Sequence, residues 1–496
     1  MKTTPSRRSF LKLAAACTAP AFGSLAFAAP QTQQKFDKVA DVIVIGSGFA
    51  GLAAALEAKE KGASVMLLEK MPAYGGNSAI NGGAFAVAGS PLQEKEGIKD
   101  SPELMLQDMI KSGRGLSHVD LLKNIVYGTR PAFDFTVKYG VKYKPFVQHF
   151  GGHSVPRIMQ TVESTGGGIT RPLVEAAKNL GVDMHLGCAV TDLILNNEGR
   201  VIGVKVLERH DYRKENSGVP QVYGARKGVV AATGGFSQNV AFRMQQDPTL
   251  GPNLESTNHP GATGDVLIDL VDIGAGTRGL DYIQCIPGGV PGEKHAPNLF
   301  THVDRFLFVN LDGKRFIKED ARRDVLRDAM LDQPKAIAWT IVDADGFEQL
   351  KNSKGPENEV ALKTGTLYYA DSIEDLAKKI GVPANNLKEA VDTYNKAVDT
   401  KKDPLGRAEG VLVNKIIKAP FYAGRVTMKR HHTMGGVIIN KDAQVIDRRG
   451  NVVPGLYAAG EVTGGIHGTN RVGGNAMADI FTYGRIAGVN AAKNPA

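Results

Sequence analysis

The stretch DVIVIGSGFAG, residues 41–51, decides the fold of this chain. Its first five residues, an aspartate followed by four apolar residues, are typical of a buried strand, and its three glycines have the GxGxxG spacing of a dinucleotide-binding turn. Gly46 permits the tight turn, Gly48 lets a pyrophosphate approach the backbone, and Gly51 lets the following helix pack on the strand. The stretch therefore predicts a strand, a phosphate-binding turn and the start of a helix.

The residues that follow supply the rest of the unit. A helical stretch covers residues 52–61, and a second apolar run, residues 64–68, ends at Glu69. Glu69 follows Gly51 by 18 residues, a spacing that suits an acid that accepts a hydrogen bond from a ribose hydroxyl. Strand, helix, strand and acid together predict an α/β domain of the Rossmann type.

Glycine-rich segments elsewhere favour FAD over NAD, a choice that the fingerprint leaves open. Residues 75–83 form a glycine-dense loop soon after the acid, and such a loop lets the backbone lie along a flat ring system. Two later apolar runs, residues 228–235 and 455–461, each reach a glycine and have the character of strands that complete a flavin fold. We therefore expect FAD as the cofactor.

Residues 1–28 have the features of a twin-arginine signal peptide. Arg7 and Arg8 lie in the stretch SRRSFLK, an alanine-rich apolar run follows, and Ala26-Phe27-Ala28 has the small-x-small form of a cleavage site. The apolar run is too short and too rich in alanine to span a bilayer well. We expect a protein exported to the periplasm, with a mature chain that begins near Ala29 and has no transmembrane segment.

Composition excludes several functional classes. The formal net charge of +9 falls to +5 without the four basic residues of the signal peptide, and no lysine- or arginine-rich run supports nucleic-acid binding. Cys188 and Cys285 remain after cleavage; a disulfide is arithmetically possible, but a chain of this size favours two buried thiols. The sequence has no CxxCH haem site or cysteine cluster, and we expect no metal site, so electrons must come from another molecule.

Several blocks beyond the fingerprint carry a family resemblance. Together they resemble the fumarate reductase/succinate dehydrogenase flavoprotein superfamily, and most closely the flavin domain of exported flavocytochrome c fumarate reductases. The resemblance extends from about residue 40 to the end of the chain. The matching blocks are residues 46–83, 258–265 (NHPGATGD), 281–284 (DYIQ), 313–316 (GKRF), 431–436 (HHTMGG) and 468–476 (GTNRVGGNA).

The resemblance implies an FAD-binding domain, residues 29–280 and 433–496, interrupted by an α+β capping domain, residues 281–432, that closes over the substrate. Membrane-bound members of the superfamily attach the flavin covalently through a histidine. Because no histidine occurs here between Val42 and Ser117, we expect noncovalent FAD. The residues expected to contact FAD are Gly46, Gly48, Ala50, Gly51, Glu69, Lys70, Gly76, Asn77, Ser78, Gly82, Gly83, Ala189, Val190, Thr233, Gly234, Asp265, Glu461, Asn475 and Ala476.

The resemblance also implies a reaction. In this superfamily reduced flavin gives a hydride to one carbon of a C=C bond next to a carboxylate, and an arginine protonates the other carbon. Matching the motifs assigns the proton to Arg323 and the binding of the carboxylate to His432 and Arg471, with His431 the less favoured member of the histidine pair. An arginine acid is unusual because its reference pKa is above 12, so a closed, positively charged pocket is required.

The residues alone leave a second interpretation open. Arg322 and Arg323 have the spacing of a surface pair bound to Glu319 or Asp324, and a lone histidine such as His432 is often a satisfied residue of the core. Only the resemblance favours catalysis over these structural roles.

Two departures from the family pattern bear on the substrate. Ile286 stands where fumarate reductases carry a histidine that helps bind a second carboxylate, and their Thr-Glu-x-x-Arg proton relay is not matched. Thr301, His302, Asp304 or Arg305 would replace that relay only in part. Because an uncompensated buried charge costs roughly 3–5 kcal/mol, we expect a monocarboxylate of the acrylate, methacrylate or cinnamate type.

Other functions stay open at this point. They are a fumarate reductase, a dehydrogenase or oxidase that runs the chemistry backwards, like the ketosteroid dehydrogenases and L-aspartate oxidase of this superfamily, and a noncatalytic electron-transfer flavin subunit. The retained Arg323, His432 and Arg471 favour reduction. Relatives fuse haem modules to the flavin domain, whereas here about a dozen residues separate the signal from the first strand, so we expect a separate c-type cytochrome as electron donor.

Overall fold

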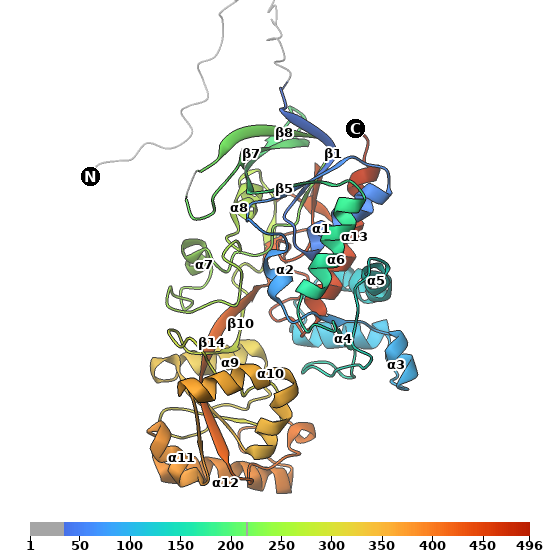
Figure 1. The fold of residues 1–496 in the computed structure, drawn as a ribbon. Helices are drawn as coiled ribbons and strands as arrows, with labels where there is room; N and C mark the ends of the chain where they lie inside the picture. Colours follow the sequence, from blue (N-terminus) through green and yellow to red (C-terminus); the bar gives the residue numbers. More distant parts are fainter. Residues whose placement is uncertain (1–33, 215–216) are drawn as a thin grey trace, which may run out of the picture. The chain divides into compact units, whose positions relative to one another are not determined.

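The structure, a computed structural model, describes residues 34–214 and 217–496 (Figure 1). The predicted signal peptide, residues 1–28, lies outside these residues. Strands and helices alternate from β1 (Lys38–Ile45) through α1 (Phe49–Glu60) to β2 (Val65–Glu69), as the fingerprint predicts. The α/β class predicted from the sequence is confirmed.

The fingerprint strand lies inside an eight-stranded sheet. β1 pairs in parallel with β2 on one side and with β8 (Val219–Ala231) on the other. The core residues of β1 and β2 are almost completely buried, as expected for parallel strands covered on both faces. The other strands of this sheet are β5 (Asp183–Leu186), β6 (Cys188–Leu195), β7 (Val201–Glu208), β16 (Gln444–Ile446) and β17 (Val452–Ala458).

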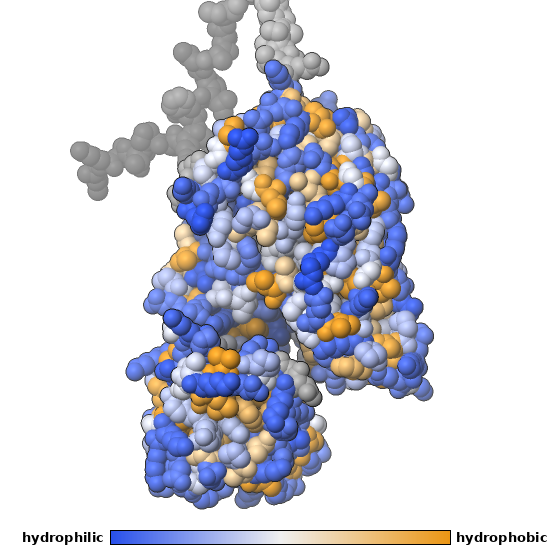
Figure 2. Space-filling model, in the orientation of Figure 1, coloured by the Kyte–Doolittle hydropathy of each residue, from blue (hydrophilic) through white to orange (hydrophobic). Residues whose placement is uncertain are grey.

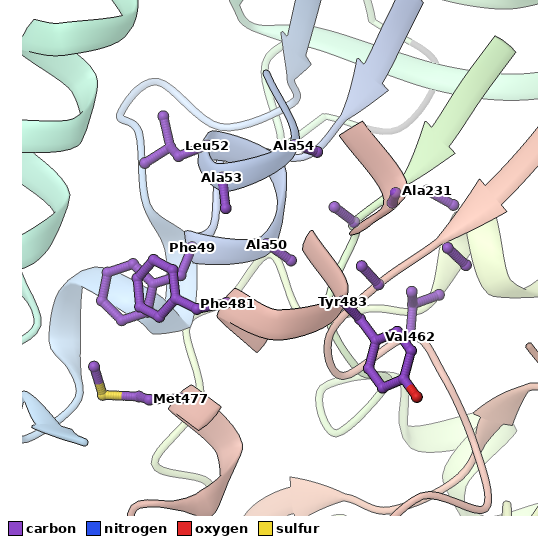
Figure 3. Close-up of a cluster of buried hydrophobic side chains, with 14 of the residues drawn as sticks. Phe49, Ala50, Leu52, Ala53, Ala54, Ala231, Val462, Met477, Phe481 and Tyr483 are labelled. Carbon is purple, nitrogen blue, oxygen red and sulfur yellow. The ribbon is translucent and has the colours of Figure 1, made fainter. Parts of the chain in front are cut away.

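The first helix packs on the last one, α13 (Asn475–Lys493), far away in the sequence. Phe49 stacks on Phe481 with 5.2 Å between the ring centroids, as Figure 3 shows. Gly484 and Gly488 let the helices approach closely, because a Cβ added to them would lie 2.7 and 2.2 Å from carbonyl oxygens of α1. This packing fixes the start of α13 beside the fingerprint turn.

A second, antiparallel sheet is formed by the part of the chain predicted to be the cap. Its strands are β10 (Ile283–Gly288), β11 (Leu307–Val309), β12 (Ala338–Val342), β13 (Leu367–Ala370) and β14 (Phe421–Thr433). A separate apolar core forms between this sheet and two helices, α11 (Ile373–Ile380) and α12 (Ala384–Thr400). The region therefore has the α+β composition expected of a cap.

The remaining elements connect or cover these two sheets. They are α2 (Gly76–Ile80), β3 (Ala84–Ala86), α3 (Pro91–Lys95), α4 (Pro102–Ser112), α5 (Val119–Lys138), β4 (Ile158–Gln160), α6 (Gly167–Asn179), α7 (Val240–Gln246), α8 (Asp265–Asp272), β9 (Thr277–Arg278), α9 (Arg323–Leu331), α10 (Ala344–Thr364) and β15 (Gly436–Val437), with two short 3₁₀ turns, Pro334–Ala336 and Glu409–Val411.

The surface is mainly polar on the face that Figure 2 draws, and the two cysteines are buried thiols, as predicted. The face drawn in Figure 2 is mainly hydrophilic, and its apolar residues form small, separate patches. Within residues 34–214 and 217–496, no helix has the length and apolar character needed to cross a membrane. Cys188 and Cys285 are both buried and form no disulfide.

Candidate active site

A cavity of about 610 Å³ opens at the end of the fingerprint strand. Its wall comes from the ends of β1, β2, β8 and β17, the 75–82 loop and the start of α13, and it also includes side chains of α9 and α10. The predicted site residues in the wall are Gly46, Gly48, Ala50, Glu69, Lys70, Gly76, Asn77, Ser78, Gly82, Val190, Thr233, Gly234, Asp265, Arg323, His432, Glu461, Arg471 and Ala476.

Four predicted residues lie behind the wall rather than in it. Gly51 packs on the fingerprint turn, where an added Cβ would lie 1.9 Å from the carbonyl oxygen of Gly46. At Gly83, the end of the glycine loop, an added Cβ would lie 2.3 Å from the hydroxyl oxygen of Thr161. Ala189 lies between Cys188 and Val190, two wall residues of β6. Asn475 is completely buried, and both polar atoms of its amide lack a hydrogen-bond partner in the structure.

The fingerprint turn presents backbone amides to the cavity. Gly46 has a φ of +98°, and a Cβ there would lie 2.4 Å from the carbonyl oxygen of Ala232. Gly48 is the N-cap of α1, and it has no side chain of its own that could cap the helix. Glu69 accepts hydrogen bonds from the Ser47 amide over 3.0 Å and from its hydroxyl over 2.6 Å. The open helix start is therefore an anion site that the predicted acid holds in shape.

The glycine loop is tied to the turn and to the segment after α7. Gly75 begins α2 with a φ of +108°, a conformation that favours glycine. The hydroxyl of Ser78 accepts from the Phe49 amide over 3.0 Å, and Asn77 donates to Asn258 over 2.8 Å. These bonds place the loop along one side of the cavity.

Two guanidinium groups reach the cavity from distant parts of the chain. Arg323 begins α9, Arg471 lies in the loop before α13, and both donate to Oε1 of Gln284, over 2.8 and 3.3 Å. The amide nitrogen of Gln284 donates to Asn470 and to the Arg471 carbonyl, which fixes the orientation of the amide. Arg323 is half-buried because its guanidinium faces the open cavity.

The electrostatics of the pair suit an anion. Burial, with the charge of Arg471 added, lowers the pKa of Arg323 to about 9. Burial also lowers the pKa of Arg471 to about 10, although Glu461 and Asp479 act in the opposite direction. Across the described part of the chain, no carboxylate forms an ion pair with either arginine; Glu461 and Asp479 lie against histidines instead. One buried and one half-buried cation, neither with a counter-ion, define a site for a carboxylate.

Arg322, the residue before Arg323, forms the surface ion pair that the alternative interpretation assigned to both arginines. Arg322 is exposed and pairs with Asp324 over 3.1 Å. Glu319 is buried and binds Arg315 and Arg407 instead, over 2.8 and 3.1 Å. Arg323 is therefore not part of a surface ion pair.

Both histidines of the HHTMGG block lie in the wall, but their environments differ. His432 Nδ1 lies 3.5 Å from Glu461, and burial lowers the pKa of His432. His431 Nδ1 lies 2.8 Å from the hydroxyl of Thr257. Burial, together with the charges of Arg323 and Arg471, holds the pKa of His431 well below its usual value. From the sequence, His431 is the less favoured carboxylate ligand of the two histidines. The structure shows that it is the histidine whose pKa is affected by both arginines.

Glu461 connects the strand end to the histidines. Burial alone would raise its pKa, but His432 and the hydrogen bonds from Thr433 bring the pKa below the usual value. The amide and the hydroxyl of Thr433 donate to the carboxylate over 2.9 and 3.0 Å. The carboxylate is therefore ionised at neutral pH.

The wall contains two residues that decide what else fits. Ile286, at the position where the family pattern has a histidine, contributes an apolar side chain to the wall. Lys354, on α10, also lines the cavity and lies 3.5 Å from Glu357, and it belongs to no motif of the sequence. Helical spacing gave no signal for Lys354, because α10 is rich in exposed lysine.

The four residues considered as a substitute proton relay are placed elsewhere. Thr301, His302, Asp304 and Arg305 are absent from the wall of this cavity. Asp304 accepts from Asn414 over 2.6 Å, and Thr301 donates to Asn298. These contacts give the segment a structural role in the cap.

The residues of the cavity fit FAD. The open amides of the fingerprint turn suit a pyrophosphate, and the buried, unpartnered amide of Asn475 needs a polar partner. The glycine loop leaves space that side chains would fill. In the part of the chain that the structure describes, no group of three or more His, Cys, Asp or Glu side chains is placed to hold a metal ion.

Comparisons with known proteins agree with this geometry. Residues 41–477 match the FAD binding domain family. The acrylate reductase flavoprotein subunit of Shewanella woodyi is 40% identical, over 97% of this chain and 97% of that protein. Urocanate reductase of Eggerthella lenta is 34% identical, over 94% of this chain and 76% of that protein. The open conformation of a flavocytochrome c3 fumarate reductase is 35% identical, with a TM-score of 0.77 over 92% of this chain and 79% of that one.

Proposed function

Because the chain belongs to the family of FAD-binding flavoprotein reductases, we propose that it reduces the C=C bond of a small α,β-unsaturated monocarboxylate. The superfamily that the sequence motifs indicated is confirmed, and so is the FAD cofactor. The protein is an FAD-dependent oxidoreductase that acts on CH–CH bonds. What is new in the proposal is the substrate class and the role of each side chain.

A single observation carries the proposal: the guanidinium groups of Arg323 and Arg471 share one neutral acceptor, Gln284, in a cavity with the features of a flavin site. A neutral amide orients both cations without neutralising them. Their charge is therefore available to an incoming carboxylate. Arg471 is suited to a bidentate grip, and Arg323 lies beside it with a lowered pKa.

The residues divide the reaction between them. FAD, when bound and reduced, supplies a hydride to one alkene carbon. Arg471 holds the carboxylate, and the cation pair stabilises the negative charge that develops as the double bond polarises. Arg323 gives its proton to the other carbon and is then reprotonated from solvent. The alkene gains two electrons and one proton as hydride, and a second proton from the arginine.

The neutral histidine next to the cations completes the carboxylate site. His431 keeps one ring nitrogen on Thr257, so the other nitrogen is free to contact the substrate. His432 lies against Glu461. We propose that His431 contacts the carboxylate directly and that His432 supports the site from the Glu461 side.

Ile286 supports a monocarboxylate as the substrate. An apolar wall cannot pair a second buried carboxylate, and leaving one unpaired costs roughly 3–5 kcal/mol. The relative from Shewanella woodyi is an acrylate reductase subunit, which agrees with such a pocket. An acrylate, methacrylate or cinnamate type of acid therefore fits the wall best.

Lys354 favours a second candidate, fumarate. Lys354 lines the same cavity, and Glu357, 3.5 Å from its ammonium nitrogen, neutralises that charge only loosely. A second carboxylate that reached Lys354 would be paired, and the penalty imposed by Ile286 would fall. The substrate panel below separates the two candidates.

The test is a panel of unsaturated acids with reduced methyl viologen as the electron donor. Acrylate, methacrylate, cinnamate, urocanate and fumarate are compared by kcat/KM. We expect the preferred monocarboxylate to exceed fumarate by on the order of 10²-fold, the factor that corresponds to an unpaired carboxylate. A preference for fumarate would refute the monocarboxylate proposal, and reoxidation by none of the acids would refute the reaction.

We further propose that the protein works in the periplasm and receives electrons from a separate c-type cytochrome. The twin-arginine stretch at residues 6–12 supports export. N-terminal sequencing of the periplasmic fraction should give a chain that starts near Ala29. Retention in the cytoplasm of cells with an intact twin-arginine system would contradict export.

A further inference from the structure

The loop that carries Arg471 is anchored at both ends. On one side the hydroxyl of Ser112, the last residue of α4, donates to the backbone carbonyl of Asn470 and accepts from the side-chain Nδ2 of Asn470, both over 3.1 Å. On the other side His153 Nε2 lies 2.7 Å from the carbonyl oxygen of Gly473. Arg471 lies between these two anchors.

The segment around His153 packs directly on the loop. A Cβ on Gly152 would lie 3.2 Å from the side chain of Val472, and a Cβ on Gly473 would lie 3.0 Å from the ring of Phe150. Each glycine therefore lies against a side chain of the other segment, so a shift of one segment must move the other. The hydrogen bond from His153 sets the register of this contact.

The tautomer of His153 follows from its partners. Arg157 Nη1 lies 3.1 Å from Nδ1, and a guanidinium can only donate, so Nδ1 must carry a lone pair. The ring proton is therefore on Nε2, where it is donated to the Gly473 carbonyl. Arg157 thus sets the ring as a neutral donor aimed at the loop.

Buried carboxylates hold Arg157 in turn. Its side chain is fully buried and binds Asp100 over 2.8 Å and Asp108 over 2.6 Å. Asp108 is a residue of α4, the helix that ends at Ser112. One rigid helix therefore supports both anchors of the Arg471 loop.

We infer that His153 is a positioning residue for Arg471: it donates from Nε2 to the Gly473 carbonyl and thereby holds the loop in the conformation that binds the substrate carboxylate. The inference rests on the proposed role of Arg471. Asp100, Asp108 and Arg157 act behind His153, as the network that fixes its tautomer.

Two substitutions separate the hydrogen bond from simple packing. In H153Q the amide nitrogen can take the place of Nε2 and still donate to Gly473. In H153N the shorter side chain can accept from Arg157 but cannot reach the carbonyl. We expect H153N to raise KM for acrylate about 10-fold, the factor for one lost buried hydrogen bond, and H153Q to remain closer to wild type. FAD content and the rate of flavin reduction by methyl viologen should stay unchanged in both.

Hydrogen exchange provides a readout that does not depend on turnover. In H153N the amides of residues 470–475 should exchange faster than in wild type, and in H153Q they should not. Unchanged KM and exchange in H153N, or equal changes in both variants, would overturn the inference. If the wild type reduces no unsaturated acid, the proposed function fails, while the exchange contrast still decides whether His153 anchors the loop.

Discussion

Arg323 Nη1 and Gln284 Oε1 lie 2.8 Å apart, and the same oxygen accepts from Arg471. An oxygen that two cations share is a weak partner for each of them, because its lone pairs are divided and it carries no full charge. Burial and the charge of Arg471 therefore lower the pKa of Arg323 to about 9, and Gln284 fixes the direction of the guanidinium without opposing that shift. A carboxylate in the position of Gln284 would instead hold the proton on the guanidinium.

Replacing the proton donor should remove activity and leave the fold intact. We expect R323Q to lower kcat on the preferred acid by about 10²- to 10⁴-fold, the usual contribution of a general acid. R322Q is the matched control, because the neighbouring arginine is exposed and pairs only with Asp324. Steady-state rates and FAD content measure both; equal losses in the two variants would contradict the assignment.

The pH dependence follows from the same group. A donor must carry its proton, so kcat/KM should fall as pH rises through about 9, the pKa of Arg323. In Q284E a carboxylate beside Arg323 favours the charged form and should move this limb upward by about 1–3 pH units. Profiles of kcat/KM between pH 6 and the upper limit of stability check the shift. A limb that stays in place in Q284E would mean that another group titrates.

Substrate choice should respond to one apolar residue. I286H supplies a donor where the wall is apolar, so fumarate turnover should rise, by about 10-fold if one charge-assisted hydrogen bond forms. I286V keeps an apolar wall and is the control. The ratio of kcat/KM for fumarate to that for acrylate is the measurement, and no change in this ratio would show that another residue selects the substrate.

Stability of the cap should depend on a buried charge cluster. Glu319 is inaccessible to solvent and binds Arg315 and Arg407. E319Q leaves the buried Arg407 without an ion-pair partner, while Arg315 keeps Asp403, and should lower the free energy of unfolding by roughly 3–5 kcal/mol. E348Q breaks only an exposed pair with Lys351 and should cost less than about 1 kcal/mol. Urea unfolding of the FAD-loaded protein measures both, and similar losses would count against the cluster.

The flavin should be released without breaking a covalent bond. The glycine loop, residues 75–83, contains no histidine that could form a covalent bond to the flavin. Acid precipitation should leave FAD in the supernatant, where its absorbance quantifies it against total protein. Yellow colour that stays in the pellet would overturn the expectation.

The sequence by itself determined the local structural motifs of the fold. The strand, glycine turn and helix of residues 41–51 form as predicted because they depend on backbone conformation and on neighbours in the chain. The motifs that contain Arg323 and Arg471 were also visible there, since each is a short run of specific residues.

Tertiary structure alone decided how these runs meet. Gln284 joins Arg323 across 39 positions and Arg471 across 187, and no periodicity or spacing encodes such a contact. The position of Lys354 in the wall and the cations beside His431 have the same origin. Side chains of the same type differ in pKa only through burial and neighbouring charge, and both are properties of the packed chain rather than of its sequence order.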